Sequence, residues 1–168
     1  MKIDWDLSER HTLDETSWPK GRLDSYTTSL EPLESVRIQV PGDVTLQMSD
    51  RAKRVILYRR SQGPDPLPGQ KGRILDKVEV YTEPMPVEEA YRTALTYADQ
   101  FGVSRAPFDD WLERRKKDVD PVTDRTGSGA DNRLGADGPF PLVELQYSPN
   151  EERPWGVMVQ FYWPPPKE

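Results

Sequence analysis

The sequence predicts an α+β domain in which a two-helix layer packs on one face of a mainly antiparallel sheet of about six strands. Residues 86–117 repeat their apolar side chains at the spacing of three and four that is typical of α-helices. The segments on either side alternate apolar and polar side chains, as a strand with one buried face does. The resulting order is four strands, two helices and two strands. That order favours helices gathered on one face of an antiparallel sheet.

Residues 1–34 follow neither period. Acidic side chains are interleaved irregularly with Trp5, Leu7 and Trp18. We expect an irregular acidic and aromatic N-terminal arm over 1–34, followed by a single domain over 35–168. Two interpretations of the arm stay open: its tryptophans attach it to the domain, or it is partly disordered and meets a partner.

A β-hairpin is predicted where the alternation begins. Apolar and polar residues alternate over 35–40 and again over 44–48. Pro41 and Gly42 lie between the two segments, and a type II turn needs proline's fixed φ followed by a residue that accepts positive φ. Because type II turns match strand twist less well than the primed types, we expect a bulge or a longer loop here.

Four more segments complete the predicted sheet, at 53–60, 74–81, 142–147 and 157–163. The first of them has a continuous apolar centre, which indicates burial on both faces. Residues 61–72 contain three prolines and three glycines and are expected to be irregular.

The first helix is predicted to begin near Pro86 and to end at Gly102. Proline suits a first helical position because its missing N–H would have no partner there, and glycine accepts the left-handed conformation after the last turn. The second helix follows at about 104–117. The side chains of the first helix that we expect to face the sheet are Tyr91, Ala94, Leu95 and Ala98.

The segment 118–138 has no apolar period and is predicted to be a flexible loop. Its aspartates are hard oxygen ligands of the kind that calcium prefers. Their spacing does not match a calcium loop, because Asp118 and Asp120 are followed by Pro121 and no glutamate closes the segment. We therefore expect no metal here, with a calcium site as the alternative.

The chain of 168 residues is 35% hydrophobic and 31% charged, which predicts one domain with a modest core. It has no cysteine, so disulfides, cysteine–metal sites and thiol nucleophiles are excluded. No apolar run approaches the roughly 20 residues of a membrane span. The N-terminus lacks the apolar core of a signal peptide, which predicts a cytoplasmic chain. An exported parent is the alternative if Met1 was added to a shortened chain.

No catalytic residue and no cofactor are predicted. His11 is the only histidine and lies in the segment expected to be irregular, so a histidine-activated nucleophile is not indicated. The sequence contains neither a Gly-x-Ser-x-Gly elbow nor a phosphate-binding glycine loop. A pair of carboxylates working as acid and base cannot be singled out among 29 acidic residues.

Residues 51–77 carry eight basic and two acidic side chains, a net charge of +6 in a chain whose total is −6. Tyr58 is the only aromatic residue in this stretch, which argues against a nucleic-acid reader. We expect its cations to pair with the acidic N-terminal arm or with an acidic protein. The candidate partner-binding residues are Arg51, Lys53, Arg54, Arg59 and Arg60.

From these observations we expect a non-enzymatic binding domain with a protein partner, of an adaptor or toxin-neutralising kind. The alternative is a small-ligand-binding or carboxylate-dependent enzyme domain with its site between the sheet and the helices. A filled interface between sheet and helices favours the first, and a concave aromatic pocket with buried carboxylates favours the second.

Overall fold

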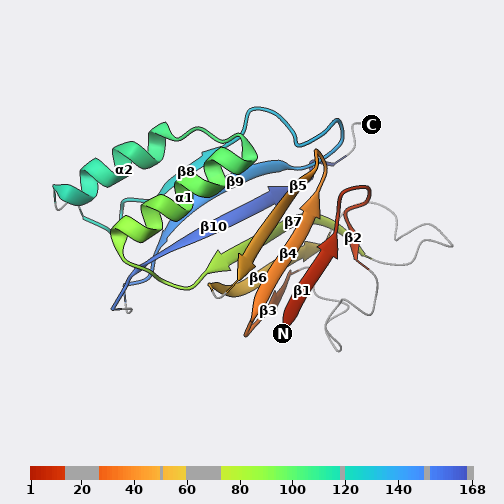
Figure 1. Ribbon diagram of the computed structural model, residues 1–168, viewed down its shortest axis with the longest axis horizontal. Coiled ribbons are helices and arrows are strands. Elements are labelled where there is room, and N and C mark those ends of the chain that lie inside the picture. Colours follow the sequence, from red (N-terminus) through yellow and green to blue (C-terminus); the bar gives the residue numbers. More distant parts are fainter. Residues whose placement is uncertain (14–26, 50, 60–72, 118–119, 150–151, 166–168) are drawn as a thin grey trace.

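The computed structural model describes residues 1–13, 27–49, 51–59, 73–117, 120–149 and 152–165 (Figure 1). Within these residues, two sheets and two helices form an α+β fold, as the sequence predicts. The larger sheet has seven strands: β2 (Thr12–Leu13), β3 (Thr27–Leu30), β6 (Ala52–Arg59), β7 (Arg73–Thr82), β8 (Thr126–Gly129), β9 (Phe140–Tyr147) and β10 (Trp155–Tyr162). The smaller sheet has three strands: β1 (Lys2–Asp6), β4 (Ser35–Val40) and β5 (Val44–Ser49). The helices are α1 (Val87–Phe101) and α2 (Ala106–Lys116).

The seven-stranded sheet runs in the order β3-β6-β7-β10-β9-β8, and β2 adds a short pairing to β7. Its strand pairs are antiparallel, and the one parallel pair among the described strands joins β1 to β4 in the small sheet. The predicted hairpin is present as β4 and β5, with Val40 opposite Val44. Gly42 in its connection has φ 87°, the positive value for which glycine was expected.

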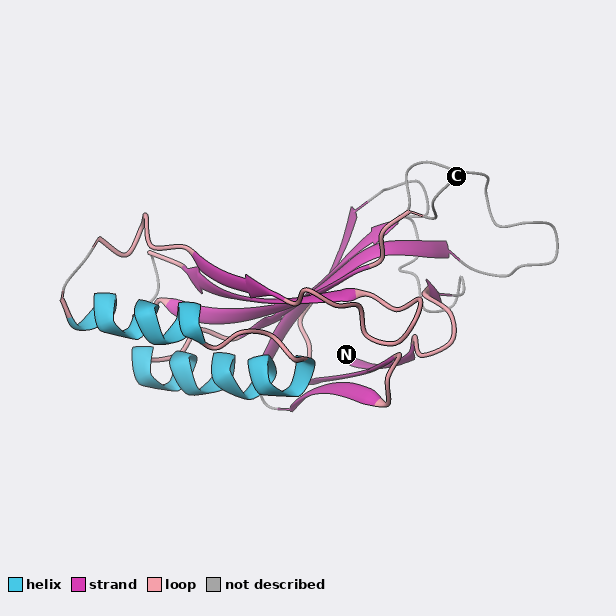
Figure 2. Cartoon of the chain, turned by 90° about the horizontal axis from the view of Figure 1, so that it is seen from above, coloured by secondary structure: helices cyan, strands magenta, loops and turns pink. Residues whose placement is uncertain are grey.

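The helices and the small sheet lie side by side as one layer beneath the seven-stranded sheet (Figure 2). The main core fills the space between this layer and the large sheet. In the central strands the directly opposite residues Val55 and Val80 are fully buried, and so are the next such partners, Leu57 and Val78, because residues two apart in a strand point the same way. Its largest fully buried side chains are Trp111, Trp155, Trp163, Phe108 and Phe161.

Helix α1 packs on the sheet through small side chains. Ala90, Ala94 and Ala98 are fully buried, whereas Tyr91 and Leu95 are half-buried at the margin of the core. The face of α1 that packs on the sheet is therefore centred on these alanines rather than on Tyr91 and Leu95. The small alanine side chain allows a helix to approach a sheet closely. Gly102 ends the helix in the predicted left-handed conformation, with φ 69°. No helix within the described residues is long and apolar enough to cross a membrane.

The end of α1 also closes the free edge of the small sheet. The Gln100 side-chain amide donates to the carbonyl oxygen of Thr45, and the Tyr97 hydroxyl lies 3.5 Å from the carbonyl oxygen of Gln47. Both acceptors belong to β5, whose outer carbonyls would otherwise have no strand beside them. The helix layer and the small sheet are thus joined by hydrogen bonds as well as by the common core.

The N-terminal segment differs from the expectation of an irregular arm, since its described part includes β1, β2 and β3. In β1, Ile3 and Trp5 point into the core, and the charged residues between them point to solvent. This is a five-residue alternation, which is too short to stand out among acidic neighbours. His11 adds a further tie, because its ring stacks on Trp163 with centroids 5.2 Å apart.

The predicted flexible loop 118–138 also contains regular structure. Strand β8 pairs with β9 at the edge of the large sheet, and its Thr126 and Ser128 are buried. Because these buried residues are small and polar, the strand carries no apolar alternation that a sequence pattern could detect. Residues 118 and 119 lie outside the described part of the chain.

Candidate functional site

The second face of the seven-stranded sheet, which we call the open face, lies opposite the helix layer. Among the residues that the structure describes, no helix or strand lies over it (Figure 2). The side chains that project from the open face alternate along their strands with side chains that are buried in the main core. They are Arg54, Tyr58, Lys77, Glu79, Tyr81, Gln160 and Tyr162.

A buried carboxylate organises the centre of the open face. Glu79 is only 6% exposed, although it lies on the side away from the core. Its Oε2 accepts hydrogen bonds from the hydroxyls of Tyr58, at 3.0 Å, and Tyr81, at 2.5 Å. Its Oε1 lies 3.0 Å from the Lys77 ammonium. One carboxylate thus holds three side chains from two strands.

Two cations cover the tyrosine rings of this group. The Lys77 ammonium lies 4.0 Å from the centroid of the Tyr58 ring, and the Arg54 guanidinium lies 4.4 Å from that of Tyr81. Both distances are within the range of cation–π attraction. We call the five residues Arg54, Tyr58, Lys77, Glu79 and Tyr81 the tyrosine–glutamate cluster.

The strand register explains why these residues meet. Arg54 is opposite Tyr81 and Tyr58 is opposite Lys77 in the antiparallel pairing of β6 and β7. Glu79 lies between Lys77 and Tyr81 on the same face of β7, because residues two apart in a strand point the same way. Directly opposite and diagonal neighbours are close enough for aromatic and long side chains to interact.

The electrostatics of the cluster favour neutral tyrosines. Burial, with the hydrogen bond to Glu79 and its negative charge, raises the pKa of Tyr58 to about 12, against a smaller opposing effect of Arg54. The same causes, with burial again the largest, raise the pKa of Tyr81 above its ordinary value. Both hydroxyls are therefore hydrogen-bond donors at neutral pH. Neither is poised to act as a tyrosinate nucleophile.

A shallow depression of about 450 Å³ adjoins the cluster at the Lys77 end. It lies where β3, β6, β7 and β10 run beside one another. Its walls combine two tyrosines, charges of both signs, an amide and a hydroxyl. The lining residues are Thr27, Tyr58, Arg59, Asp76, Lys77, Gln160 and Tyr162.

The sequence-predicted basic residues are dispersed by the structure. Arg51 forms an ion pair with Glu89 of α1, on the helix side. Lys53 is half-buried at an irregularity in the pairing of β6 with β7. Arg54 belongs to the tyrosine–glutamate cluster, and Arg59 lines the depression. Arg60 lies outside the described residues.

The sequence reasoning did not single out Glu79, Tyr81 or Gln160. Their pattern was visible, since Lys77, Glu79 and Tyr81 alternate with apolar residues on one strand. A polar side of a strand is usually solvated, so the alternation alone did not indicate that its carboxylate would be buried. The missing information is the pairing of β6 with β7, which places Tyr58 diagonally across from Glu79.

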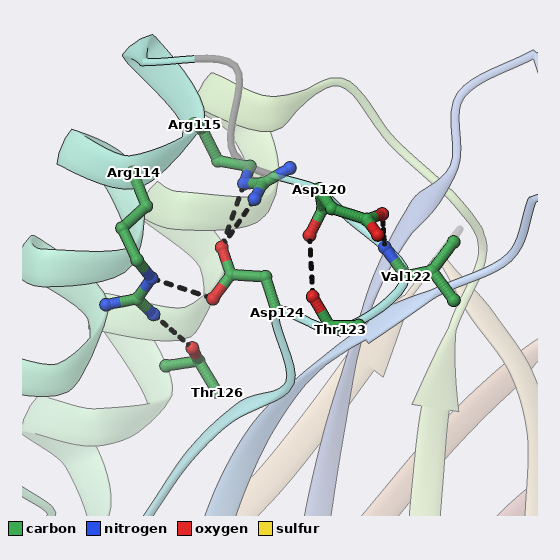
Figure 3. Close-up of polar contacts among 7 residues, drawn as sticks. All are labelled: Arg114, Arg115, Asp120, Val122, Thr123, Asp124 and Thr126. Carbon is green, nitrogen blue, oxygen red and sulfur yellow. Dashed lines mark hydrogen bonds and ion pairs between the residues drawn. The ribbon is translucent and has the colours of Figure 1, made fainter.

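A second buried carboxylate lies on the opposite side of the sheet, at the end of α2 (Figure 3). Asp124 accepts from Arg114 at 2.7 Å and from Arg115 at 2.6 Å, and Arg114 also donates to the Thr126 hydroxyl at 2.7 Å. The Asp124 and Arg115 side chains are 5% and 8% exposed. We call these four residues the Asp124 clamp, and they fasten the segment before β8 to helix α2. The sequence suggested only that these arginines stabilise the helix end.

The clamp also bears on the metal and pocket expectations. Because Asp124 is held by two guanidinium groups, it is committed as a structural acceptor rather than a calcium ligand. No group of three or more His, Asp or Glu residues suited to a metal occurs within the described ranges.

A hollow of about 360 Å³ adjoins the clamp at the end of the sheet–helix interface, where Arg115 lies 5.3 Å from the Trp155 ring centroid.

Comparisons with protein-family models, with curated proteins and with solved structures found no match to this chain.

Proposed function

We propose that this chain is a non-enzymatic binding domain that contacts a protein partner through the open face of the seven-stranded sheet. The observation that carries the proposal is the tyrosine–glutamate cluster, in which one buried carboxylate orders two tyrosines beneath two stacked cations. Tyrosine and arginine are the residues that most often dominate binding energy at protein interfaces. Side chains that are already ordered lose little conformational entropy on binding.

The surroundings of the cluster support the same proposal. Tyr162 is 39% exposed next to the depression, as one of the few large apolar side chains among the described residues that reach solvent. The space between the sheet and the helices is filled by fully buried aromatic side chains such as Trp111 and Phe161. The open face therefore offers both the ordered aromatics and the accessibility that an interface needs.

A small-ligand site is the second candidate, because the hollow beside the Asp124 clamp is lined by Tyr147 and Trp155 together with Glu88 and Lys116. Its volume lies within the usual range of ligand pockets. Arg115, its most buried cation, is already neutralised by Asp124. We therefore rank this site below the open face.

Site-specific photo-crosslinking in the native host tests the proposal. A photoreactive phenylalanine analogue replaces Tyr162 on the open face or, as the matched control, Val122, which is 63% exposed in the loop after α2. We expect a discrete protein product from position 162 and none of the same mass from position 122. Adding Gln160→Arg at the cluster's margin should remove the product while the circular dichroism spectrum is unchanged. Equal crosslinking from both positions, or none from position 162, would contradict the proposal.

A further inference from the structure

We infer that two copies of this chain associate through the outer edge of β8. The two β8 strands pair antiparallel about Ser128, so that the seven-stranded sheet continues from one copy into the other. This inference concerns an edge of the sheet and does not depend on the binding function proposed for the open face. It is argued from the backbone groups of β8, from the charges at its ends and from the charges along α2.

Gly127 and Gly129 direct their backbone N–H and C=O groups away from the sheet. The Ala130 N–H donates at 3.0 Å to the carbonyl oxygen of Pro141, which the register of β8 and β9 places opposite it. In an antiparallel pair, residues that bond to the neighbouring strand alternate along the strand with residues that do not. Ser128, two residues before Ala130, therefore bonds to β9, and the two glycines face outward.

The outer edge of β8 is open to a further strand. Within the described part of the chain, β8 ends the seven-stranded sheet, and the outward groups of its two exposed glycines form no hydrogen bond. The edge of the small sheet differs, because Tyr97 and Gln100 of α1 close the outer carbonyls of β5. An edge with unpaired N–H and C=O groups is a template for strand pairing.

This edge is complementary to a second copy of itself. With a twofold axis at Ser128, Gly127 of each copy lies opposite Gly129 of the other, and each such pair exchanges two backbone hydrogen bonds. The same register places Arg125 of one copy opposite Asp131 of the other. Arg125 is 80% exposed, and Asp131 is exposed and forms no ion pair among the described residues. Each end of the edge thus meets the opposite charge.

Helix α2 carries a second self-complementary pattern beside the edge. Its Arg114 donates to Thr126 of β8 at 2.7 Å, so the side of α2 that carries Arg114 adjoins this strand. The exposed Asp110 and Lys117 lie on that same side, because residues three, four or seven apart share one side of a helix. The twofold axis sets the two α2 helices antiparallel, with Asp110 of one toward Lys117 of the other. Because both patterns match their own inverse, the edge fits a second copy of the chain.

Single-cysteine variants of the full chain test the inference, because the chain itself contains no cysteine. Ser128→Cys places one thiol from each copy beside the twofold axis, where the Cα atoms of a non-hydrogen-bonded pair are about 4.5 Å apart and can form a disulfide. Ala130→Cys is the matched control on the same side of β8, since its two thiols would be roughly 13 Å apart along the strand. We expect diamide to oxidise Ser128→Cys to a covalent dimer about tenfold faster than Ala130→Cys.

A charge exchange tests the register without altering β8 and does not depend on the cysteine variants. Sedimentation equilibrium of the unmodified chain should show a dimer that dissociates on dilution. Arg125→Glu and Asp131→Arg should each weaken this dimer about tenfold, because the twofold axis doubles the effect of each change. The two changes combined should restore most of the affinity. Both positions are exposed, so the circular dichroism spectra should be unchanged.

Three results would overturn the inference: a chain that stays monomeric at every concentration, equal oxidation rates of the two cysteine variants, or no recovery of affinity in the charge exchange. If oxidation in the native host joins position 128 to a different protein, the edge receives a foreign strand and the second copy is wrong. Crosslinking from Tyr162 reports on the open face, so the two proposals fail independently.

Discussion

The Tyr81 hydroxyl donates a 2.5 Å hydrogen bond to Glu79, two residues earlier on the same face of β7. The same carboxylate oxygen accepts from Tyr58 on the neighbouring strand, so Glu79 ties β6 to β7 through side chains as well as through the backbone. This arrangement makes the shape of the open face depend on one buried negative charge. It also makes that dependence measurable, because the tyrosines titrate.

Replacing Glu79 with glutamine should loosen the cluster without changing its volume. We expect the free energy of unfolding to fall by about 1–3 kcal/mol, because the half-buried Lys77 ammonium and two hydroxyls lose a charged acceptor. Burial, the largest cause that raises the pKa of Tyr58 to about 12, remains in this variant, whereas the hydrogen bond to the carboxylate and its negative charge are lost, so the pKa should fall part of the way toward its ordinary value of 10.0. Denaturant unfolding and the ultraviolet absorbance of tyrosinate measure the two effects.

The control for this change is Glu144→Gln on the same face. Glu144 accepts from Gln146 at 2.7 Å and lies on β9, which the strands β7 and β10 separate from Tyr58 on β6. Its replacement should leave the Tyr58 titration unchanged. Equal effects of the two substitutions on the pKa of Tyr58 would show that Glu79 does not order the cluster.

The protein should lose stability as the pH rises from about 10 to about 12. Burial is the main cause that raises the pKa of both Tyr58 and Tyr97 to about 12. In this window the unfolded chain has released protons that the folded chain still binds, so the free energy of unfolding falls with rising pH. The stabilisation that these protonated tyrosines give the folded state is complete below pH 10 and is lost as the pH rises through their folded-state pKa of about 12.

Tyr97→Phe should make this alkaline loss shallower, because one of the titrating groups is removed. Tyr162→Phe, at the exposed end of β10, is the comparison variant. Stability measured by urea unfolding at a series of pH values gives the slopes. A wild-type curve that stays flat between pH 10 and 12 would mean that Tyr58 and Tyr97 do not retain their protons in the folded state.

Asp124→Asn should strongly lower the free energy of unfolding, because it breaks the Asp124 clamp at the end of α2. It leaves Arg115, whose side chain is 8% exposed, without the carboxylate that neutralises it. Breaking a buried pair by removing one partner costs about 3–5 kcal/mol, because the remaining charge stays buried. Asp120→Asn is the control, since Asp120 is exposed and makes local bonds to Val122 and Thr123 (Figure 3). A loss below about 0.5 kcal/mol at Asp124 would show that the clamp does not hold the helix end.

The elements predicted from the sequence are those with long, periodic apolar patterns. Strands β4, β5, β6, β7, β9 and β10 and both helices carry such patterns, because each buries one face against the main core. Strands β1 and β8 lacked a signal for different reasons. In β1 the period covers five residues, and in β8 the buried residues are Thr126 and Ser128. Short or polar strands are specified by the neighbours they pair with, which a linear pattern does not contain.

The candidate site was less predictable than the fold. The sequence indicated that cations gather on residues 51–60, but it could not show which strand faces them. In the structure, Arg51 forms an ion pair with Glu89 on α1. Arg54 lies opposite Tyr81 in the pairing of β6 with β7. The ordering residue, Glu79, comes from a strand about twenty positions later. Sites assembled across strands depend on pairing, and charge counts along the chain do not reveal it.

The N-terminal strand gives the last prediction, which concerns how the acidic arm stabilises the domain. If its acidic side chains acted mainly by pairing with cations, removing residues 1–6 would cost less as salt screens the pairs. The structure instead buries Ile3 and Trp5 against β4, while Asp4 forms an exposed ion pair with Arg37 at 3.1 Å. We therefore expect Trp5→Ala to cost about 3–5 kcal/mol at both low and high salt, and Asp4→Asn to cost less than about 1 kcal/mol. Unfolding measured at two salt concentrations decides. If the destabilisation caused by Trp5→Ala became smaller at high salt, the N-terminal segment would stabilise the domain mainly through charge pairing.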